Sequence, residues 1–373
     1  MRVVNSSTYR SFTSSINDVH SKLNKSMNKV SSGRAYESAA ENSLAYYQGQ
    51  KIDHQYQDAL SKQSLITDLK GRVDQQCTGV YSIQTTLAKA KTKLQYIRSD
   101  TNNPSQEQIT TIRNDVLQKE QSIVNDLNAQ YQNFYVFGGN DISTTPFSLS
   151  ADGRTLTYSH KFPSDTASTE MKITLKDDGS GFDIDDATMD NILRAMKEQG
   201  RVDVGYGSIT DTNTLINTYT SGFNVLTGLT SDALKAMSDD DAKKQIQERL
   251  DTSAVAILGN AVIASDTLNN DFDNTSKKAA FSETIGNLID TSTITEGVIS
   301  TVYSDFGTKY NLLENLDEKL SNTMDSLTEE YTNKLGADPY EAITEMYSYQ
   351  YSYSAALKVG SQMMQASLFD FIS

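Results

Sequence analysis

The chain has 373 residues, and its formal net charge of −15 at pH 7 makes nucleic acid and anionic membrane surfaces unfavourable partners. No apolar run approaches the roughly 18 residues that a membrane-spanning helix needs, so membrane insertion is not expected. A single cysteine, Cys77, excludes an internal disulfide framework.

The N-terminal residues 1–12 are polar, show no clear apolar period and lack the hydrophobic core of a cleaved signal peptide. After them, apolar residues recur every three or four positions and predict a helix: Ile16, Val19, Leu23, Met27 and Val30. The predicted helix ends at Ser31-Ser32-Gly33, because glycine readily adopts the left-handed conformation that stops a helix.

Two further long helices are predicted in residues 43–98 and 109–134. The first has its clearest apolar period at Val73, Cys77, Val80, Ile83, Leu87, Ala90, Leu94 and Ile97. A turn at 101–104 follows, and Ser105 with Gln108 forms a candidate capping box. Because the second apolar row runs from Ile109 to Phe134, we expect the two helices to pack antiparallel through this turn.

The middle of the chain has a different pattern. Short β-like runs occupy 147–150, 154–159 and 171–176, and Ala151-Asp152-Gly153 predicts a hairpin turn between the first two. An amphipathic helix is predicted at 186–199, and residues 232–290 are expected to be helical in part.

The helical pattern returns at residues 294–335, with an apolar row from Val302 to Tyr331. Asp338 is then a candidate N-cap, with Pro339 at the first position of a last long helix. That helix has an apolar row at three- and four-residue spacing and many tyrosines, which we interpret as interface anchors. These residues include Ile343, Met346, Tyr347, Tyr353, Leu357, Met364, Leu368 and Phe369.

The two chain ends have complementary features. The first 40 residues have six basic side chains against two acidic ones, whereas the last 35 have three acidic against one basic. We therefore expect the ends to pair through their apolar rows, with a modest electrostatic contribution. The predicted assembly interface comprises Ile16, Val19, Leu23, Met27, Val30, Ile343, Met346, Tyr347, Tyr353, Leu357, Met364, Leu368 and Phe369.

The sequence offers little chemistry. His20, His54 and His160 have no metal-ligand arrangement around them, so we interpret them as solvated or packed surface residues. Cys77 lies on an apolar helix face and is expected to be a buried, inert thiol. The acidic run at 177–186 lacks the layout of a calcium loop and is interpreted as a turn before a capped helix. No catalytic residue, cofactor or metal is predicted.

These elements predict a mainly α fold: a long-helix bundle or coiled-coil rod formed by both chain ends, with an inserted α+β, β-rich domain. Residues 1–42 with 338–373 would form a terminal helical assembly domain. Residues 43–145 with 291–337 would form the long-helix rod, and 146–290 the inserted mixed α+β surface domain.

Several short segments resemble the flagellin-like axial proteins of the bacterial flagellum. They are the start Met1-Arg2-Val3, the segment Leu23…Val30-Ser-Ser-Gly-Arg34, and Tyr135-Val-Phe-Gly-Gly-Asn140. The ending Gln365-Ala-Ser-Leu-Phe-Asp-Phe-Ile372 is similar to that of one branch, the hook–filament junction proteins called hook-associated protein 3. The resemblance covers roughly residues 1–145 and 295–373. Residues 38–42 lack the Asp-Asp-Pro element that members usually have there.

This resemblance implies a structural, non-enzymatic protein of the extracellular flagellum that links hook-associated protein 1 to the flagellin filament by helix packing between subunits. It further implies a homo-oligomeric ring, a flagellar export chaperone, and type III export without a cleaved signal peptide. Two alternatives remain open: a minor flagellin that forms filament itself, and a surface-binding or enzymatic middle domain on a helical stalk.

Overall fold

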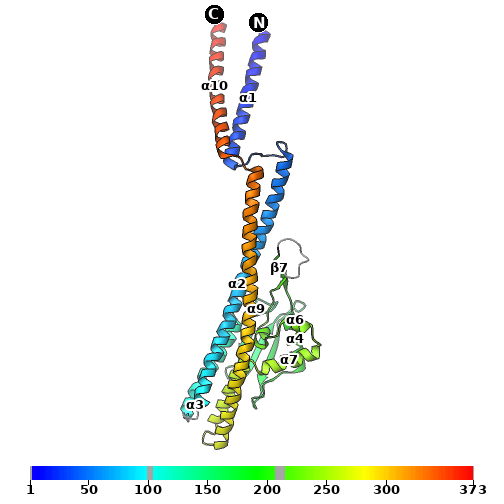
Figure 1. Ribbon diagram of the computed structural model, residues 1–373, viewed down its shortest axis with the longest axis vertical. Helices are drawn as coiled ribbons and strands as arrows, with labels where there is room; N and C mark the ends of the chain where they lie inside the picture. The colour runs from blue at the N-terminus through cyan, green and yellow to red at the C-terminus, as the bar shows by residue number, and fades with distance from the viewer. Residues whose placement is uncertain (1, 99–103, 206–214, 373) are drawn as a thin grey trace. The chain divides into compact units, whose positions relative to one another are not determined.

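The computed structural model describes residues 2–98, 104–205 and 215–372, with side chains described for residues 7–362 of these ranges. The fold is mainly α with a small inserted β-containing domain, as predicted (Figure 1). The chain divides into two compact units. Unit 1 is Met1–Gln63 with Lys319–Ser373, and unit 2 is Ser64–Glu318.

Unit 2 is built on two long helices, α2 (Ser43–Arg98) and α9 (Thr275–Leu335), which both continue into unit 1. Within unit 2, ion pairs join them from Lys91 to Glu296 at 3.0 Å and from Lys70 to Glu314 at 3.5 Å. The predicted apolar row of α2 is buried at Val73, Val80, Ile83, Leu87, Ala90, Leu94 and Ile97. Cys77 is expected to be buried in this row, but it is only half-buried. This partial burial raises the pKa of its thiol.

Helix α3 (Gln106–Leu127) begins with the predicted capping box, in which Ser105 Oγ accepts from the Gln108 backbone N–H. Residues 101–103 of the predicted turn before it lie outside the described residues. Helix α8 (Ala254–Asn269) packs on α3 and is buried along most of its length. Arg113 Nε and Nη2 each donate to Asp266 at 3.0 Å, which fixes the alignment of these two helices.

The prediction that this helix continues to Phe134 is wrong. It ends at Leu127, and the chain turns back through a hairpin of β1 (Gln130–Tyr131) and β2 (Phe134–Tyr135). Gln132 and Asn133 adopt φ values of 50° and 67°, the left-handed pair that a two-residue hairpin turn requires. Phe134 is consequently 50% exposed.

The inserted domain has a four-stranded antiparallel sheet in the order β3 (Phe147–Leu149), β4 (Thr155–His160), β5 (Thr169–Leu175) and β6 (Phe182–Asp183). The amphipathic helix is confirmed as α4 (Asp186–Met196), capped by Asp185. A second pair, β7 (Arg201–Asp203) with β8 (Leu215–Asn217), precedes three helices. These are α5 (Gly222–Thr227), α6 (Ser231–Lys235) and α7 (Asp239–Asp251).

His160 is not a surface residue, because inward and outward side chains alternate along β4 and place it inside, fully buried. Its Nε2 lies 3.1 Å from Glu198 Oε2, and its Nδ1 lies 3.1 Å from the carbonyl oxygen of Gly138. The imidazole therefore ties the Phe-Gly-Gly segment to the sheet of the inserted domain.

Helix α9 begins at Thr275, earlier than the predicted residue 294. The added turns bury Phe281, Ile285, Leu288 and Ile289 at helical spacing. Residues 232–290 are helical over most of their length, in α6, α7, α8 and the start of α9.

Candidate assembly interface

Unit 1 ends in two paired helices, α1 (Arg2–Ser32) and α10 (Pro339–Ile372), which confirms the expected pairing of the chain ends (Figure 1). Lys29 meets Glu345, His20 meets Tyr353, and Phe12 meets Gly360. From one contact to the next the residue number decreases along α1 and increases along α10, so the two helices are antiparallel. Helix α1 also includes residues 2–12, where the sequence shows no apolar period.

Backbone hydrogen bonds fix the end of the pair at which α1 ends and α10 begins. Gly33, at φ 68°, ends α1 as predicted, and its N–H donates to the Lys29 carbonyl at 2.9 Å. The chain then pairs with the α9–α10 junction: Ala35 N–H donates to Leu335 O at 2.6 Å, and Ala337 N–H to Gly33 O at 2.9 Å. These bonds hold the start of α10 beside the end of α1.

Helix α10 begins where the sequence predicts. Asp338 Oδ1 accepts from the backbone N–H groups of Tyr340 at 2.8 Å and of Glu341 at 3.1 Å. Pro339 occupies the first helical position, where its missing N–H costs nothing. The cap therefore fixes the residue at which α10 begins.

Charge contributes little to the pairing. Lys29 Nζ lies 3.1 Å from Glu345 Oε2, and each side chain is about a third exposed, so this bridge contributes on the order of 0–1 kcal/mol. Lys25 Nζ lies 2.6 Å from Glu41 Oε1 at an exposed site, but Glu41 lies between α1 and α2, so this ion pair does not join α1 to α10. The hydrogen bond from Lys25, followed by that of the Glu37 N–H, lowers the pKa of Glu41. Apolar packing must supply most of the stability of the pair.

The predicted interface residues separate into two sets. Five lie half-buried: Ile16, Val19, Leu23, Met346 and Tyr353. The sequence analysis missed Phe12, Ser26 and Ala342, of which Ser26 and Ala342 are 1% and 3% exposed. A search for large apolar residues overlooks small ones, although small residues are what let two helices approach closely.

The other predicted residues with described side chains are exposed although apolar. Met27 is 50%, Val30 38%, Ile343 41%, Tyr347 61% and Leu357 48% exposed. Met364, Leu368 and Phe369 lie in α10, but their side chains are outside the described residues.

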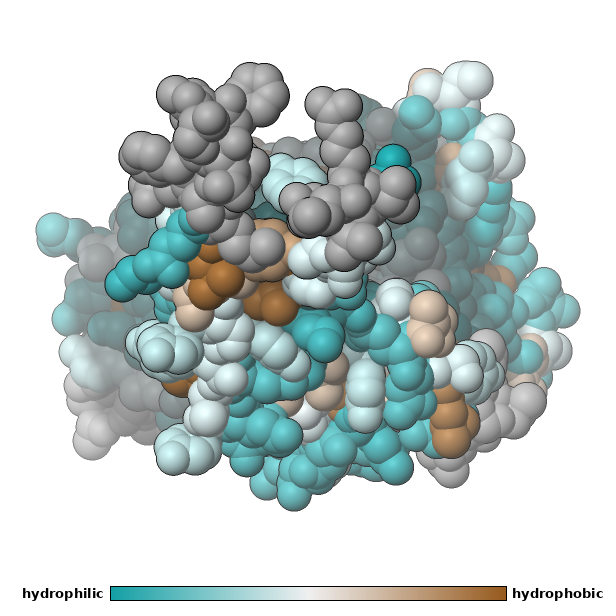
Figure 2. All heavy atoms as spheres, turned by 90° about the horizontal axis from the view of Figure 1, so that it is seen from above, coloured by the Kyte–Doolittle hydropathy of each residue, from teal (hydrophilic) through white to brown (hydrophobic). Residues whose placement is uncertain are grey.

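Four exposed side chains of α10 form a row. Tyr340, Ile343, Tyr347 and Tyr351 follow one another at spacings of three and four, which places them on one helix face. Tyr340 and Tyr351 are 82% and 79% exposed. We name these four residues the outward row. Figure 2 views the end that holds both termini and shows hydrophobic side chains exposed there among polar ones.

In the part of the chain that the structure describes, no group of three or more His, Cys, Asp or Glu side chains is placed to hold a metal ion. None of the described helices combines the length and apolar character needed to cross a membrane.

No model of a protein family matches the chain, and no curated protein matches it in sequence. Solved structures do match. A protein from Vibrio parahaemolyticus described as a flagellar hook-associated protein aligns with 79% of this chain and 100% of its own, at a TM-score of 0.50 and 12% identity. The chain shares the fold of that hook-associated protein.

Two other structures align over a similar share of the chain. FlgL from Bacillus cereus covers 78% of this chain and 100% of its own, at a TM-score of 0.39 and 15% identity. Flagellar hook-associated protein 3 from Legionella pneumophila covers 78% and 98%, at a TM-score of 0.41 and 12% identity.

Proposed function

We propose that this chain is a structural component of the bacterial flagellum: the junction adaptor between hook-associated protein 1 and the flagellin filament. The fold shared with a hook-associated protein supports a flagellar role. The short segments at both chain ends that resemble axial flagellar proteins support the junction branch in particular. The proposal involves no reaction and no cofactor.

The observation that carries the proposal is the outward row on α10. Fully burying a large apolar side chain contributes about 1.5–3 kcal/mol. Ile343 and Tyr347 are still 41% and 61% exposed in the single chain, so part of this stabilisation is available to a partner. The α1–α10 pair already satisfies its facing side, so the partner of the outward row is a neighbouring subunit. Repeating this contact around a closed ring matches the homo-oligomer expected from the resemblance.

The aromatic content of the row suits such a contact. Tyrosine has an apolar ring and a polar hydroxyl, and it is enriched where one end of a side chain is buried in an interface and the other stays wet. In the proposed ring, Tyr340, Tyr347 and Tyr351 pack against the terminal helices of adjacent subunits. Export through the flagellar type III route with a dedicated chaperone is part of the same proposal.

A complementation experiment tests this function. Cells that lack this chain should secrete flagellin without holding filaments, and the wild-type gene should restore attached filaments and motility. Tyr347→Asp should fail to restore them, because it puts a charge into an apolar contact. The control Ser352→Asp adds the same charge at an exposed polar position of α10 that lies outside the outward row, and it should restore motility. Normal filaments in cells without the chain would refute the proposal, and filaments formed by the purified chain alone would favour a minor flagellin.

A further inference from the structure

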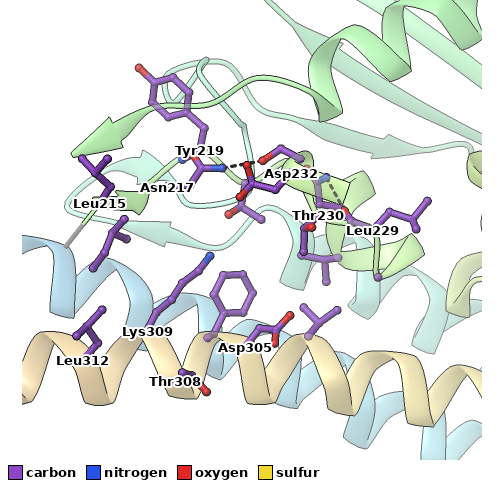
Figure 3. Close-up of a pocket in the computed structure, with 18 residues that line it drawn as sticks. Leu215, Asn217, Tyr219, Leu229, Thr230, Asp232, Asp305, Thr308, Lys309 and Leu312 are labelled. Atoms are coloured by element: carbon purple, nitrogen blue, oxygen red, sulfur yellow. Dashed lines mark hydrogen bonds between the residues drawn. The ribbon is translucent and has the colours of Figure 1, made fainter. Parts of the chain in front are cut away.

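A cavity of about 380 Å³ lies in unit 2, between the C-terminal part of the inserted domain and one face of α9 (Figure 3). It is lined by β8, the residues that follow it, the loop between α5 and α6, and residues 302–312 of α9. This volume is at the lower end of the roughly 300–1,000 Å³ that small-molecule sites occupy. The cavity has no part in the assembly contact proposed above.

The walls of the cavity are largely apolar. Ile216 and Val225 line it from the inserted domain, and Val302, Phe306 and Leu312 line it from α9. Ile216, Val225 and Phe306 are buried residues with little freedom to move aside. An apolar body of a few carbon atoms or one ring would find contacts on both sides.

The polar groups on the inserted-domain side are already engaged. Asn217 Nδ2 donates to Ser231 Oγ at 2.9 Å, and Asn217 Oδ1 accepts from the Gly200 N–H at 3.1 Å. Asn224 Nδ2 donates to the Leu229 carbonyl at 2.7 Å. Asp232 Oδ1 accepts from Arg201 Nη2 at 2.8 Å. These groups shape the cavity but have little capacity left for a ligand.

Lys309 differs from them. It projects from α9 into the cavity, on the side facing Asn217 and Tyr219 (Figure 3), and its Nζ lies 5.2 Å from the centroid of the Phe306 ring. Among the described residues its ammonium has no hydrogen bond and no ion pair. Burial lowers the pKa of Lys309, and the carboxylates of Asp305 and Asp232 only partly oppose this.

We propose that this cavity binds a small monocarboxylate with an apolar body, in which the carboxylate pairs with Lys309 Nζ and the body packs against Phe306 and Ile216. A lone desolvated ammonium gains more from a carboxylate than an exposed one does. The nearby carboxylates of Asp305 and Asp232 select for a single negative charge, because they repel a phosphate or a dicarboxylate more strongly.

Phenylacetate is a suitable probe, and ligand-observed NMR with the full-length chain measures its binding. We expect a Kd of about 1 mM or tighter for the wild type. Lys309→Met keeps the length of the side chain and removes its charge, and it should weaken phenylacetate binding at least tenfold. Lys244→Met removes an exposed lysine of α7 and should leave binding unchanged. The neutral analogue 2-phenylethanol should bind the wild type at least tenfold more weakly than phenylacetate.

Lys309→Met should unfold at the same temperature as the wild type or a higher one, since it relieves the burial of a charge. Lost binding in this variant is then a loss of the ligand contact and not of the fold. Absence of phenylacetate binding to the wild type, or equal binding to wild type and Lys309→Met, would overturn the proposal. A blocked glutamyl peptide that binds more tightly than phenylacetate would overturn the assignment of a free small ligand and identify a neighbouring protein as the source of the carboxylate.

Discussion

Gly360 on α10 lies against the ring of Phe12 on α1, so closely that a Cβ atom at Gly360 would stand 2.8 Å from Phe12 Cε1. Real side chains do not tolerate such an approach without movement. The glycine lies far along α10 from its anchored start, where the α1–α10 pair depends on side-chain packing alone. The contact therefore sets how closely the two helices approach near their free ends.

Gly360→Leu should separate the ends of α1 and α10. The Phe12 ring can rotate away from a single methyl group, so Gly360→Ala should have a small effect, whereas the leucine side chain needs the space of the ring itself. Limited proteolysis should cleave the terminal helices faster in Gly360→Leu than in the wild type. Ser361→Leu places the same side chain at the next, exposed position and should be cut at the wild-type rate. Equal protection of Gly360→Leu and wild type would show that the contact does not hold the pair together.

Glu120 should make unit 2 less stable as the pH rises. It is fully buried on α3, and neither carboxylate oxygen has a hydrogen-bond partner among the described residues. Burial, with a further contribution from Asp152, raises its pKa well above 4.5 against the opposing charge of Arg113. The folded state therefore binds a proton more tightly than the unfolded state. The free energy of unfolding of unit 2 therefore carries no penalty from Glu120 below pH about 4.5, and it decreases as the pH rises from there toward the folded pKa of Glu120.

Glu120→Met should remove that pH dependence and raise the free energy of unfolding at neutral pH by about 1–3 kcal/mol, because no buried polar group is left unpaired. Urea unfolding at about pH 5 and about pH 8 measures both effects. Glu107→Gln, at an exposed position of α3, is the control and should behave as the wild type does. If Glu120→Met is less stable than the wild type at neutral pH, the carboxylate has a partner that stabilises it.

The boundary of the inserted domain can be tested by two deletions. The sequence predicts a domain at 146–290, but α8 packs along α3 and is joined to it by Arg113 and Asp266. A chain that lacks residues 146–252 and carries a short linker keeps α8 and should unfold cooperatively with high helicity. A chain that lacks 146–290 loses α8 and exposes the buried face of α3, so it should be markedly less stable. Equal stability of the two would support the predicted boundary at 290.

The parts of the fold that sequence predicts best are those with many regularly spaced apolar residues. In the row from Val73 to Ile97 all eight positions recur at helical spacing over several turns, and seven of the eight are buried. The end of α3 was missed because the turn depends on left-handed Gln132 and Asn133, and glutamine is not a typical residue for that conformation. The start of α9 is harder to predict because Thr and Ser are frequent among residues 275–293 and obscure the apolar period.

The candidate interface was predictable in composition but not in orientation. Ile343 and Met346 have similar apolar side chains, yet Met346 lies half-buried and Ile343 is exposed. Only the direction of approach of α1, fixed by backbone bonds around Gly33 and Ala337, distinguishes them. The Lys309 cavity could not be foreseen, because its lining residues come from segments about 90 positions apart.

The central claim is that this chain forms the junction at which the filament meets the hook, and the place of the protein on isolated flagella tests it most directly. Antibody against the inserted domain, imaged by electron microscopy with gold labelling, should mark one narrow band at the hook–filament boundary. The Tyr347→Asp chain should give no band there. Label distributed along the filament, or absent from the flagellum, would contradict the account.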